Sequence, residues 1–274
     1  MAEATSESSV GQETVPAVEI ENLTVSYGPT PALLDITLEV PQGLLVGIIG
    51  PNGSGKSTLI KSILGFKKPD VGEVRLFGES FERSRGRVAY VPQHGAVDWE
   101  FPITVQDVAL MGRYGNVPWW RDLTAKDKQL AADALKMVRM QDFAKRQIGQ
   151  LSGGQRQRVF MARAMAQGAD ILLLDEPFSG VDAATERAIL DVLQRTKESG
   201  RTLLVVHHDL ATAAEYFDRL ILLKQRLYAY GPAEVVLDQE LLGAVYEGQL
   251  RVFRHLHADA HLPAELGTGK KPSG

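Results

Sequence analysis

The sequence predicts an α/β fold in which a parallel β-sheet is combined with an antiparallel β layer and an inserted helical layer. An unbroken apolar run at residues 44–50 leads into a glycine-rich loop, which is typical of a buried parallel strand that feeds a helix. Two further short apolar runs, at 171–174 and 203–206, also indicate buried strands. The helical pattern at 183–198 between them has the right length for a right-handed crossover. Buried strands that alternate with helices are the pattern of α/β proteins.

The antiparallel layer is predicted from the N-terminal part of the chain. At 18–27 and 33–40, apolar and polar residues alternate on either side of a Gly-Pro turn, as they do in half-buried antiparallel strands. A further short strand pattern follows at 72–77, and 88–91 resembles another buried strand. We therefore expect an antiparallel layer to precede the main sheet.

The helical layer is predicted from residues 104 to about 145, where the apolar spacing becomes helical. Its apolar face is expected to contain Val105, Val108, Ala109, Leu130, Ala134, Leu135 and Val138. Because this region interrupts the series of buried strands, we expect a helical subdomain at about 94–160.

Composition limits the possible partners. The 30 basic and 34 acidic residues give a net charge of -4, so no overall cationic field is available to hold nucleic acid. Without cysteine the chain can form neither a disulfide nor a thiolate metal site. The longest apolar runs have the length of strands, far below the roughly 20 residues needed to span a bilayer. A role at a membrane would therefore require a partner.

The two ends of the sequence differ from the rest. Residues 1–16 contain no basic residue before an apolar core, so we expect a disordered leader rather than a secretory signal or transit peptide. Residues 251–274 are expected to form a polar tail. One large domain at 17–250 is expected between them.

Residues 50–58 have the sequence GPNGSGKST, which matches the phosphate-loop pattern GxxxxGK[ST] between a buried strand and a helical stretch. Glycines let successive backbone amides face a phosphate, and the dipole of the following helix adds positive potential. Lys56 would neutralise the β and γ phosphates, and Ser57 would hold Mg²⁺. Four fixed positions in this context favour a phosphate loop over an ordinary glycine-rich turn. The loop residues expected to contact nucleotide are Gly50, Asn52, Gly53, Ser54, Gly55, Lys56, Ser57 and Thr58.

Residues 171–176 have the sequence ILLLDE, which places two carboxylates at the carboxyl end of a buried strand. Ligands of open α/β sheets bind at this end. Asp175 would orient Mg²⁺ through water, and Glu176 would polarise the attacking water, since phosphoryl transfer requires positioning more than covalent chemistry. Solvated acids at the end of a strand are the alternative, and the phosphate loop upstream favours the catalytic interpretation.

Residues 151–155 have the sequence LSGGQ and resemble the signature of ABC ATPases, which lies a short distance before the acidic strand in that family. The phosphate loop, Gln93 in VPQ, the acidic strand and His208 in HHDL also occur in the family's order, and the resemblance covers about residues 18–230. It implies a RecA-like P-loop core with an N-terminal antiparallel β layer and an inserted helical subdomain. It also implies ATP and Mg²⁺ as cofactors and the hydrolysis of ATP to ADP and phosphate.

The resemblance implies roles for single residues around the nucleotide. Tyr27 resembles the aromatic residue that stacks on adenine, and its alternative is a strand-end tyrosine in the core. Gln93 resembles the glutamine that touches Mg²⁺ or water and reports the nucleotide state to a membrane partner, and its alternative is a plain polar loop residue. His208 resembles the histidine that contacts the γ phosphate, whereas His207 is expected to be a surface or core histidine. With these roles the implied Mg²⁺ set is Ser57, Gln93 and Asp175.

The signature implies a dimer. Ser152 and Gly154 resemble donors that reach the γ phosphate of a nucleotide held by a second copy of the domain, and Gly153 and Gln155 of the same signature are also expected to bind nucleotide. Asp182 in SGVD resembles the loop that crosses between two chains, although SALD is the commoner form in the family. Each chain of a homodimer would then supply half of two composite sites, and ATP would close the pair like a clamp.

Two segments, 97–115 and 205–218, resemble the manganese/zinc import branch of ABC ATPases. This resemblance implies a motor on the inner face of the cell membrane, bound to integral membrane permease subunits and served indirectly by an extracytoplasmic metal-binding protein. Manganese is favoured, with zinc or iron possible. The first segment would receive the membrane subunit through its aromatic and acidic side chains, unless these simply cover the helical layer. Those side chains are Asp98, Trp99, Glu100 and Phe101.

Two functions of ABC ATPases are alternatives to metal transport. The alternatives are a cassette that imports another substrate and one that acts outside transport, as in DNA repair or ribosome rescue. Between Lys56 and Asp175 there are no heptads long enough for the coiled-coil arm of repair proteins, and only one phosphate loop is present, whereas ribosome-acting members carry two cassettes. The intact Lys56, Asp175, Glu176 and His208 oppose a catalytically dead cassette.

Two further features have both a functional and a plain interpretation. His255, His257 and His261 could bind a transition metal, although the favoured interpretation is a tail with scattered histidines. Trp119 and Trp120 would suit either a docking patch or a loop anchored on the helical layer.

Overall fold

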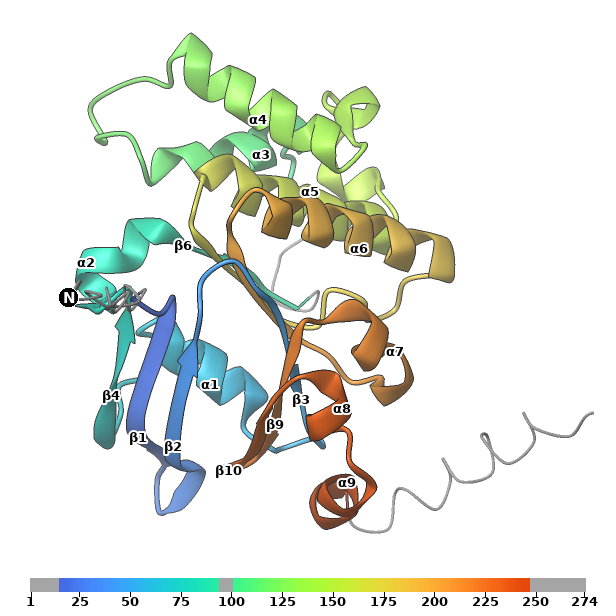
Figure 1. Ribbon diagram of the computed structural model, residues 1–274. Coiled ribbons are helices and arrows are strands. Elements are labelled where there is room, and N and C mark those ends of the chain that lie inside the picture. Colours follow the sequence, from blue (N-terminus) through green and yellow to red (C-terminus); the bar gives the residue numbers. More distant parts are fainter. Residues whose placement is uncertain (1–14, 94–100, 247–274) are drawn as a thin grey trace, which may run out of the picture.

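The structure is a computed structural model that describes residues 15–93 and 101–246. It contains two β-sheets and a layer of helices (Figure 1). The strands are β1 (Val18–Tyr27), β2 (Thr30–Val40), β3 (Leu45–Ile49), β4 (Val71–Leu76), β5 (Glu79–Ser80), β6 (Val88–Val91), β7 (Ile171–Leu174), β8 (Thr202–Val206), β9 (Arg219–Lys224) and β10 (Arg226–Gly231). The α-helices are α1 (Lys56–Ile63), α2 (Phe81–Ser84), α3 (Val105–Tyr114), α4 (Ala125–Met137), α5 (Gly153–Gln167), α6 (Ala183–Glu198), α7 (Leu210–Tyr216), α8 (Ala233–Val236) and α9 (Gln239–Tyr246). Short 3-10 turns are η1 (Arg85–Arg87), η3 (Gln141–Phe143) and η4 (Ile148–Gln150).

The larger sheet has six strands in the order β10-β9-β3-β8-β7-β6. Its neighbouring strands pair in parallel from β9 through β6, and β10 pairs antiparallel with β9. Strand β7 shows why these segments are apolar without alternation. Ile171 and Leu173 pack on one side of the sheet, and Leu172 and Leu174 pack on the other. A strand covered on both faces requires apolar side chains at every position.

The smaller sheet is antiparallel, with four strands in the order β2-β1-β4-β5. Its inward side chains form one apolar cluster with helix α1 and with one face of the larger sheet, and this cluster includes Val18, Ile36, Leu59 and Ile48. Strand β1 alternates buried and more exposed residues, as its sequence predicts. The antiparallel sheet therefore holds α1, and with it the loop that precedes α1, against the larger sheet.

The helical layer consists of α3, α4 and α5, which pack on one another above the larger sheet (Figure 1). Capping boxes begin α3 at Thr104 and α4 at Thr124. A partly buried ion pair joins the first two helices, because Arg113 Nε donates to Asp127 Oδ1 at 3.0 Å. The second nitrogen of the same guanidinium donates to the Ala166 and Gln167 carbonyls at the end of α5.

The structure confirms the predicted fold class, and the predicted strands are displaced by only a few residues. The expectation for Leu130 is wrong, since it is 37% exposed and Ala131 takes the buried position in α4. The hairpin of β9 and β10 was not predicted, although 220–223 is an apolar run of strand length. The segments 1–14 and 247–274 lie outside the described residues, and the proposed domain boundaries stay a prediction. Among the helices that the structure describes, none is long and apolar enough to cross a membrane.

Candidate functional site

The predicted site residues follow the carboxyl ends of adjacent parallel strands. Val91 of β6 pairs with Leu174 of β7, and Leu174 pairs with Val205 of β8. Ile48 of β3 pairs with Val206. Because the four strands end in register, the loops that follow them lie at one edge of the sheet. The fold therefore brings the phosphate loop, the glutamine of VPQ, the two acids and the two histidines together.

The phosphate loop depends on glycines in conformations that other residues rarely adopt. Gly50 has φ 151°, and a Cβ there would lie 2.1 Å from the carbonyl oxygen of Leu223. Gly55 has φ 101°, and its Cβ would lie 2.7 Å from the Ala32 carbonyl oxygen. The Gln225 amide donates to the Ser54 carbonyl at 2.8 Å, which fastens the loop to the hairpin of β9 and β10. Helix α1 starts directly after the loop, so its first amides face the loop's concave side.

Lys56 is held inside this loop. Its side chain is 8% exposed, and Nζ donates to the carbonyl oxygens of Gly50 at 2.8 Å and Pro51 at 2.9 Å. Burial lowers the pKa of Lys56, and the nearby carboxylates of Glu176 and Asp175 oppose that shift. The lysine thus lies between the loop and the two acids, where a phosphate group would meet it.

Asp175 is a buried carboxylate with two hydroxyl partners. It is 7% exposed, and the side chains of Ser57 and Tyr90 are hydrogen-bonded to it. Burial and the Glu176 carboxylate raise the pKa of Asp175, and the bond from Ser57 opposes them. Burial and Asp175 also raise the pKa of Tyr90 to about 12. The phenol of Tyr90 therefore stays protonated and donates to the carboxylate.

Glu176 and Gln93 contact each other directly. Nε2 of Gln93 donates to Oε2 of Glu176 at 2.7 Å, although the two residues are 83 positions apart. Glu176 has φ 50°, in the left-handed region that residues other than glycine seldom occupy. Such backbone conformations are concentrated at functional sites. A hydrogen bond thus joins two residues that were predicted to be catalytic.

The two histidines after β8 occupy opposite environments. His208 is exposed at the sheet edge, as a residue that contacts a ligand must be. His207 is 1% exposed and packs among aromatic rings. Of the two expected alternatives for His207, a surface histidine or a core histidine, the structure therefore shows the core histidine.

Tyr27 lies at the end of β1 and is 52% exposed, which excludes the alternative of a core tyrosine. The ammonium of Lys67 is 5.2 Å from the centre of its ring, which is a cation–π contact. An exposed aromatic face at the edge of the antiparallel sheet is available for stacking on a planar group.

The signature segment forms the N-terminus of helix α5. The Ser152 side chain accepts from the Gln155 amide, and the Gln155 side chain accepts from the Ser152 amide, so the two residues form a capping box. A Cβ on Gly154 would lie 2.8 Å from the Thr185 side chain, so the segment touches the start of α6. Asp182 caps α6 through Thr185 and is itself exposed. Ser152 and Gly153 are exposed as well, on the surface where a second chain would have to contact them.

The residues implied for Mg²⁺ fit that ion. Mg²⁺ prefers oxygen ligands and is bound through one or two carboxylates together with substrate phosphates. Ser57 and Asp175 already share a hydrogen bond, so their oxygens lie together. With its nitrogen bound to Glu176, the side chain of Gln93 still has its carbonyl oxygen as an acceptor.

The surface predicted to receive a membrane subunit is only partly described. Asp98, Trp99 and Glu100 lie outside the described residues, and Phe101 is 60% exposed. In the loop between α3 and α4, Trp119 is 92% exposed and Trp120 is 73% exposed. Their rings contact each other edge-on at 5.7 Å.

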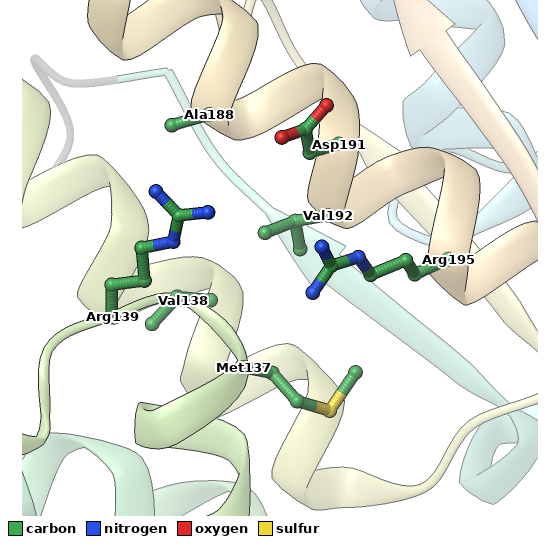
Figure 2. Close-up of a pocket in the computed structure, with 7 residues that line it drawn as sticks. All are labelled: Met137, Val138, Arg139, Ala188, Asp191, Val192 and Arg195. Carbon is green, nitrogen blue, oxygen red and sulfur yellow. The ribbon is translucent and has the colours of Figure 1, made fainter.

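A pocket between the end of α4 and helix α6 is a different place from this site. Figure 2 shows the guanidinium groups of Arg139 and Arg195 and the carboxylate of Asp191 around it. Val138 and Val192 also line it. None of the predicted site residues lines this pocket, so it is not the nucleotide site.

Comparison with known proteins identifies the family and the fold. Residues 33–179, more than half of the chain, match the ABC transporter family. The chain belongs to the ABC transporter family. Its ABC cassette is therefore an ATPase, as the phosphate loop, the acidic strand and the signature predict.

Curated ABC relatives match most of the chain. The manganese transport system ATP-binding protein MntB of Bacillus subtilis is 54% identical, over 85% of this chain and 93% of the relative. The zinc transport system ATP-binding protein TroB of Treponema pallidum is 51% identical, over 85% of this chain and 88% of the relative.

Solved ABC cassettes have the same fold. One cassette in its ADP conformation has a TM-score of 0.74 and 27% identity, over 86% of this chain and 100% of that chain. A dimeric bacterial ABC transporter cassette has a TM-score of 0.70 and 29% identity, over 79% of this chain and 98% of that chain.

Two contacts at the candidate site were not predicted. Tyr90 was not singled out, although it precedes Gln93 by three positions on a buried strand, and an inward aromatic residue there was the available signal. Lys67 was not connected with Tyr27, and no local pattern could have shown that contact.

Proposed function

We propose that this chain is the ATP-hydrolysing motor subunit of an ABC importer that energises uptake of a divalent transition metal through membrane subunits. Manganese is the favoured metal, ahead of zinc and iron. The observation that carries the metal assignment is the 54% identity to a manganese transport ATP-binding protein over nearly the whole of that relative. A zinc transport ATP-binding protein at 51% identity supports the same class of cargo.

Hydrolysis is assigned to the residues at the edge of the larger sheet. Lys56 and the amides of the phosphate loop would hold the β and γ phosphates, and Glu176 would orient the attacking water. His208, exposed beside them, would contact the γ phosphate. When bound, Mg²⁺ would neutralise the developing phosphate charge. Ser57, Asp175 and Gln93 would hold it.

A homodimer is proposed because Ser152 and Gly153 of the signature lie exposed at the start of α5. Ser152 and Gly154 would meet the γ phosphate of a nucleotide bound to the other copy, and Gly153 and Gln155 would complete the nucleotide-binding set at that helix terminus. The likeness to a dimeric cassette supports this arrangement. Asp182, exposed at the start of α6, would lie at the contact between the two chains.

We place the dimer peripherally on the inner face of the cell membrane, bound to integral membrane permease subunits. The proposed contact surface begins after Gln93 and includes the exposed Phe101. An extracytoplasmic metal-binding protein would deliver the metal to the permease, and it would act on this chain only indirectly. The ATPase itself never touches the metal in this arrangement.

Metal uptake tests the proposal. Cells that lack this chain and redundant importers should accumulate less manganese, and the wild-type chain should restore uptake. A Lys56→Ala chain should not restore it, which separates ATP hydrolysis from assembly. Zinc and iron uptake measured in the same cells would rank the metals. Normal uptake of all three metals in the deletion would reject the metal assignment.

The alternative is an ABC ATPase that imports another substrate or acts outside transport. It predicts that the chain copurifies with a different permease or with no membrane subunit. Isolation of the complex from membranes, followed by identification of its partners, distinguishes the two functions without depending on any single mutant.

A further inference from the structure

A cluster of aromatic rings lies beneath the predicted catalytic loops, with His207 at its centre. The His207 ring meets Phe178 nearly edge-on, with 5.5 Å between ring centres and 86° between planes. It contacts Phe217 at 5.3 Å and Tyr216 at 5.8 Å. At 1% exposure, its contacts are those of a core residue.

The members of the cluster belong to segments that carry catalytic residues. Phe178 follows Glu176 by two positions, and His207 directly precedes His208. Tyr216 ends α7, and its hydroxyl donates to Oε1 of Glu186 at 3.1 Å, near the start of α6. The cluster thus joins the loop of the attacking-water residue to the turn of the γ-phosphate residue.

The imidazole also makes a hydrogen bond that an apolar core residue could not make. Nε2 of His207 lies 2.9 Å from Oγ1 of Thr212 in α7, and Oγ1 lies 3.4 Å from the Asp209 carbonyl oxygen. A threonine hydroxyl carries one proton, so if it donates to Asp209, the imidazole must donate from Nε2. This chain of bonds closes the turn that contains His208.

The ring is neutral at neutral pH. Burial and the neighbouring His208 lower the pKa of His207 to about 4, although Asp209 opposes the shift. A neutral imidazole bears one proton, and the bond to Thr212 sets the nitrogen that carries it. If the Thr212 hydroxyl donates to the Asp209 carbonyl, the neutral imidazole therefore carries its proton on Nε2 and donates to Thr212.

We propose that His207 is a positioning residue for ATP hydrolysis, holding the His208 turn through Thr212 and the Glu176 loop through Phe178. The proposal rests on the roles given above to His208 and Glu176. A core residue that only filled space would leave catalysis unchanged when replaced by another ring of similar size. A positioning residue must lower kcat when its hydrogen bond is removed.

Two substitutions remove the hydrogen bond between His207 and Thr212, each by replacing one of its two partners. His207→Phe keeps a ring in the cluster and removes the donor, and Thr212→Val keeps the shape of the side chain and removes the acceptor. Each should lower kcat about tenfold, the effect of roughly one hydrogen bond, and leave the KM for ATP within about twofold. The double variant should be no slower than the slower single variant, because both changes remove the same bond.

The controls separate positioning from folding. Thr196→Val removes the hydroxyl of a buried threonine, which donates to the Val192 carbonyl within α6, and it should leave kcat unchanged. His207→Gln should recover most of the activity, since its amide nitrogen can donate toward Thr212. Thermal unfolding of every variant shows whether a loss of kcat only follows a loss of stability.

The measured kcat values support or overturn the positioning role of His207. Wild-type kcat in His207→Phe or Thr212→Val, or an equal loss in Thr196→Val, would overturn the proposal, as would losses that only follow the melting temperature. Wild-type chain without MgATP hydrolysis, measured beside Glu176→Gln, would overturn the proposed function together with this inference. Lowered kcat with unchanged KM, rescued by glutamine, supports the positioning role.

Discussion

Gly112 lies in α3 at the place where this helix crosses α5. A Cβ on Gly112 would be 2.1 Å from the Arg163 carbonyl oxygen and 3.1 Å from the Gln167 amide nitrogen. Gly112 is not among the glycines with positive φ, so alanine would meet no backbone strain there. The cost of Gly112→Ala is therefore the steric contact alone, and both clashing atoms belong to the backbone of α5.

The size of the effect follows from that distance. Carbon–oxygen contacts need about 3.3 Å, so the two helices would have to separate by about 1 Å. Separation loosens the packing of Val105, Val108 and Ala109 against α5. Overpacking costs about 1–3 kcal/mol, and a contact with backbone belongs at the upper end. Alanine returns up to about 1 kcal/mol of helix propensity, so we expect Gly112→Ala to lower the free energy of unfolding by about 2 kcal/mol.

Urea unfolding at pH 7 measures this change, provided that the slope with denaturant stays the same. Gly115→Ala is a matched control at the end of α3, because φ there is -66° and a Cβ meets nothing within 4 Å. The control should be unchanged or up to about 1 kcal/mol more stable. A Gly112→Ala chain as stable as the control would refute the close contact of α3 and α5.

Three other predictions concern the site. Lys56→Ala should abolish ATP turnover, because the triphosphate loses its principal cation; a rate equal to wild type would contradict the phosphate-loop assignment. Glu176→Gln should bind ATP without hydrolysing it and trap a dimer visible by sizing chromatography, and added Ser152→Arg should prevent pairing. If Glu176→Gln stays monomeric with MgATP, the composite site is wrong. Because the pKa of His207 falls from 6.5 to about 4 on folding, the unfolded chain binds more protons between those pH values. Stability should therefore fall as the pH drops from 6.5 to 4, and His207→Gln should reduce that slope in urea titrations; an unchanged slope would show that His207 is not buried as a neutral base.

Much of the main sheet could be predicted because its strands are buried on both faces. The pattern at 171–174 coincides with β7, and the one at 203–206 misses only the first residue of β8. The hairpin of β9 and β10 was harder, since its second strand mixes buried and exposed residues without strict alternation. Leu130 was misplaced because α4 turns Ala131 inward, and a leucine on the rim of a helical face fits the same spacing.

The site could be predicted as a set of segments and not as a network. Each segment follows a strand, so the parallel sheet alone brings them to one edge. The contacts between them depend on side chains from distant parts of the sequence, such as Gln93 with Glu176 and Tyr90 with Asp175. No local periodicity encodes which of the nearby polar groups will pair.

The hydrogen bonds that Lys56 and Glu176 make in this structure indicate how nucleotide binding would affect other parts of the chain. Lys56 is bonded to carbonyls of its own loop, and Glu176 is bonded to Gln93. In the proposed hydrolysis, Lys56 and Glu176 would exchange these bonds for bonds to the γ phosphate and the attacking water. Release of Gln93 would free the end of β6, and the chain continues from there toward the exposed Phe101 and helix α3. In the proposed transporter, the bond between Gln93 and Glu176 would therefore be an element that nucleotide on one side and a membrane subunit on the other both bias, as coupling between two sites requires.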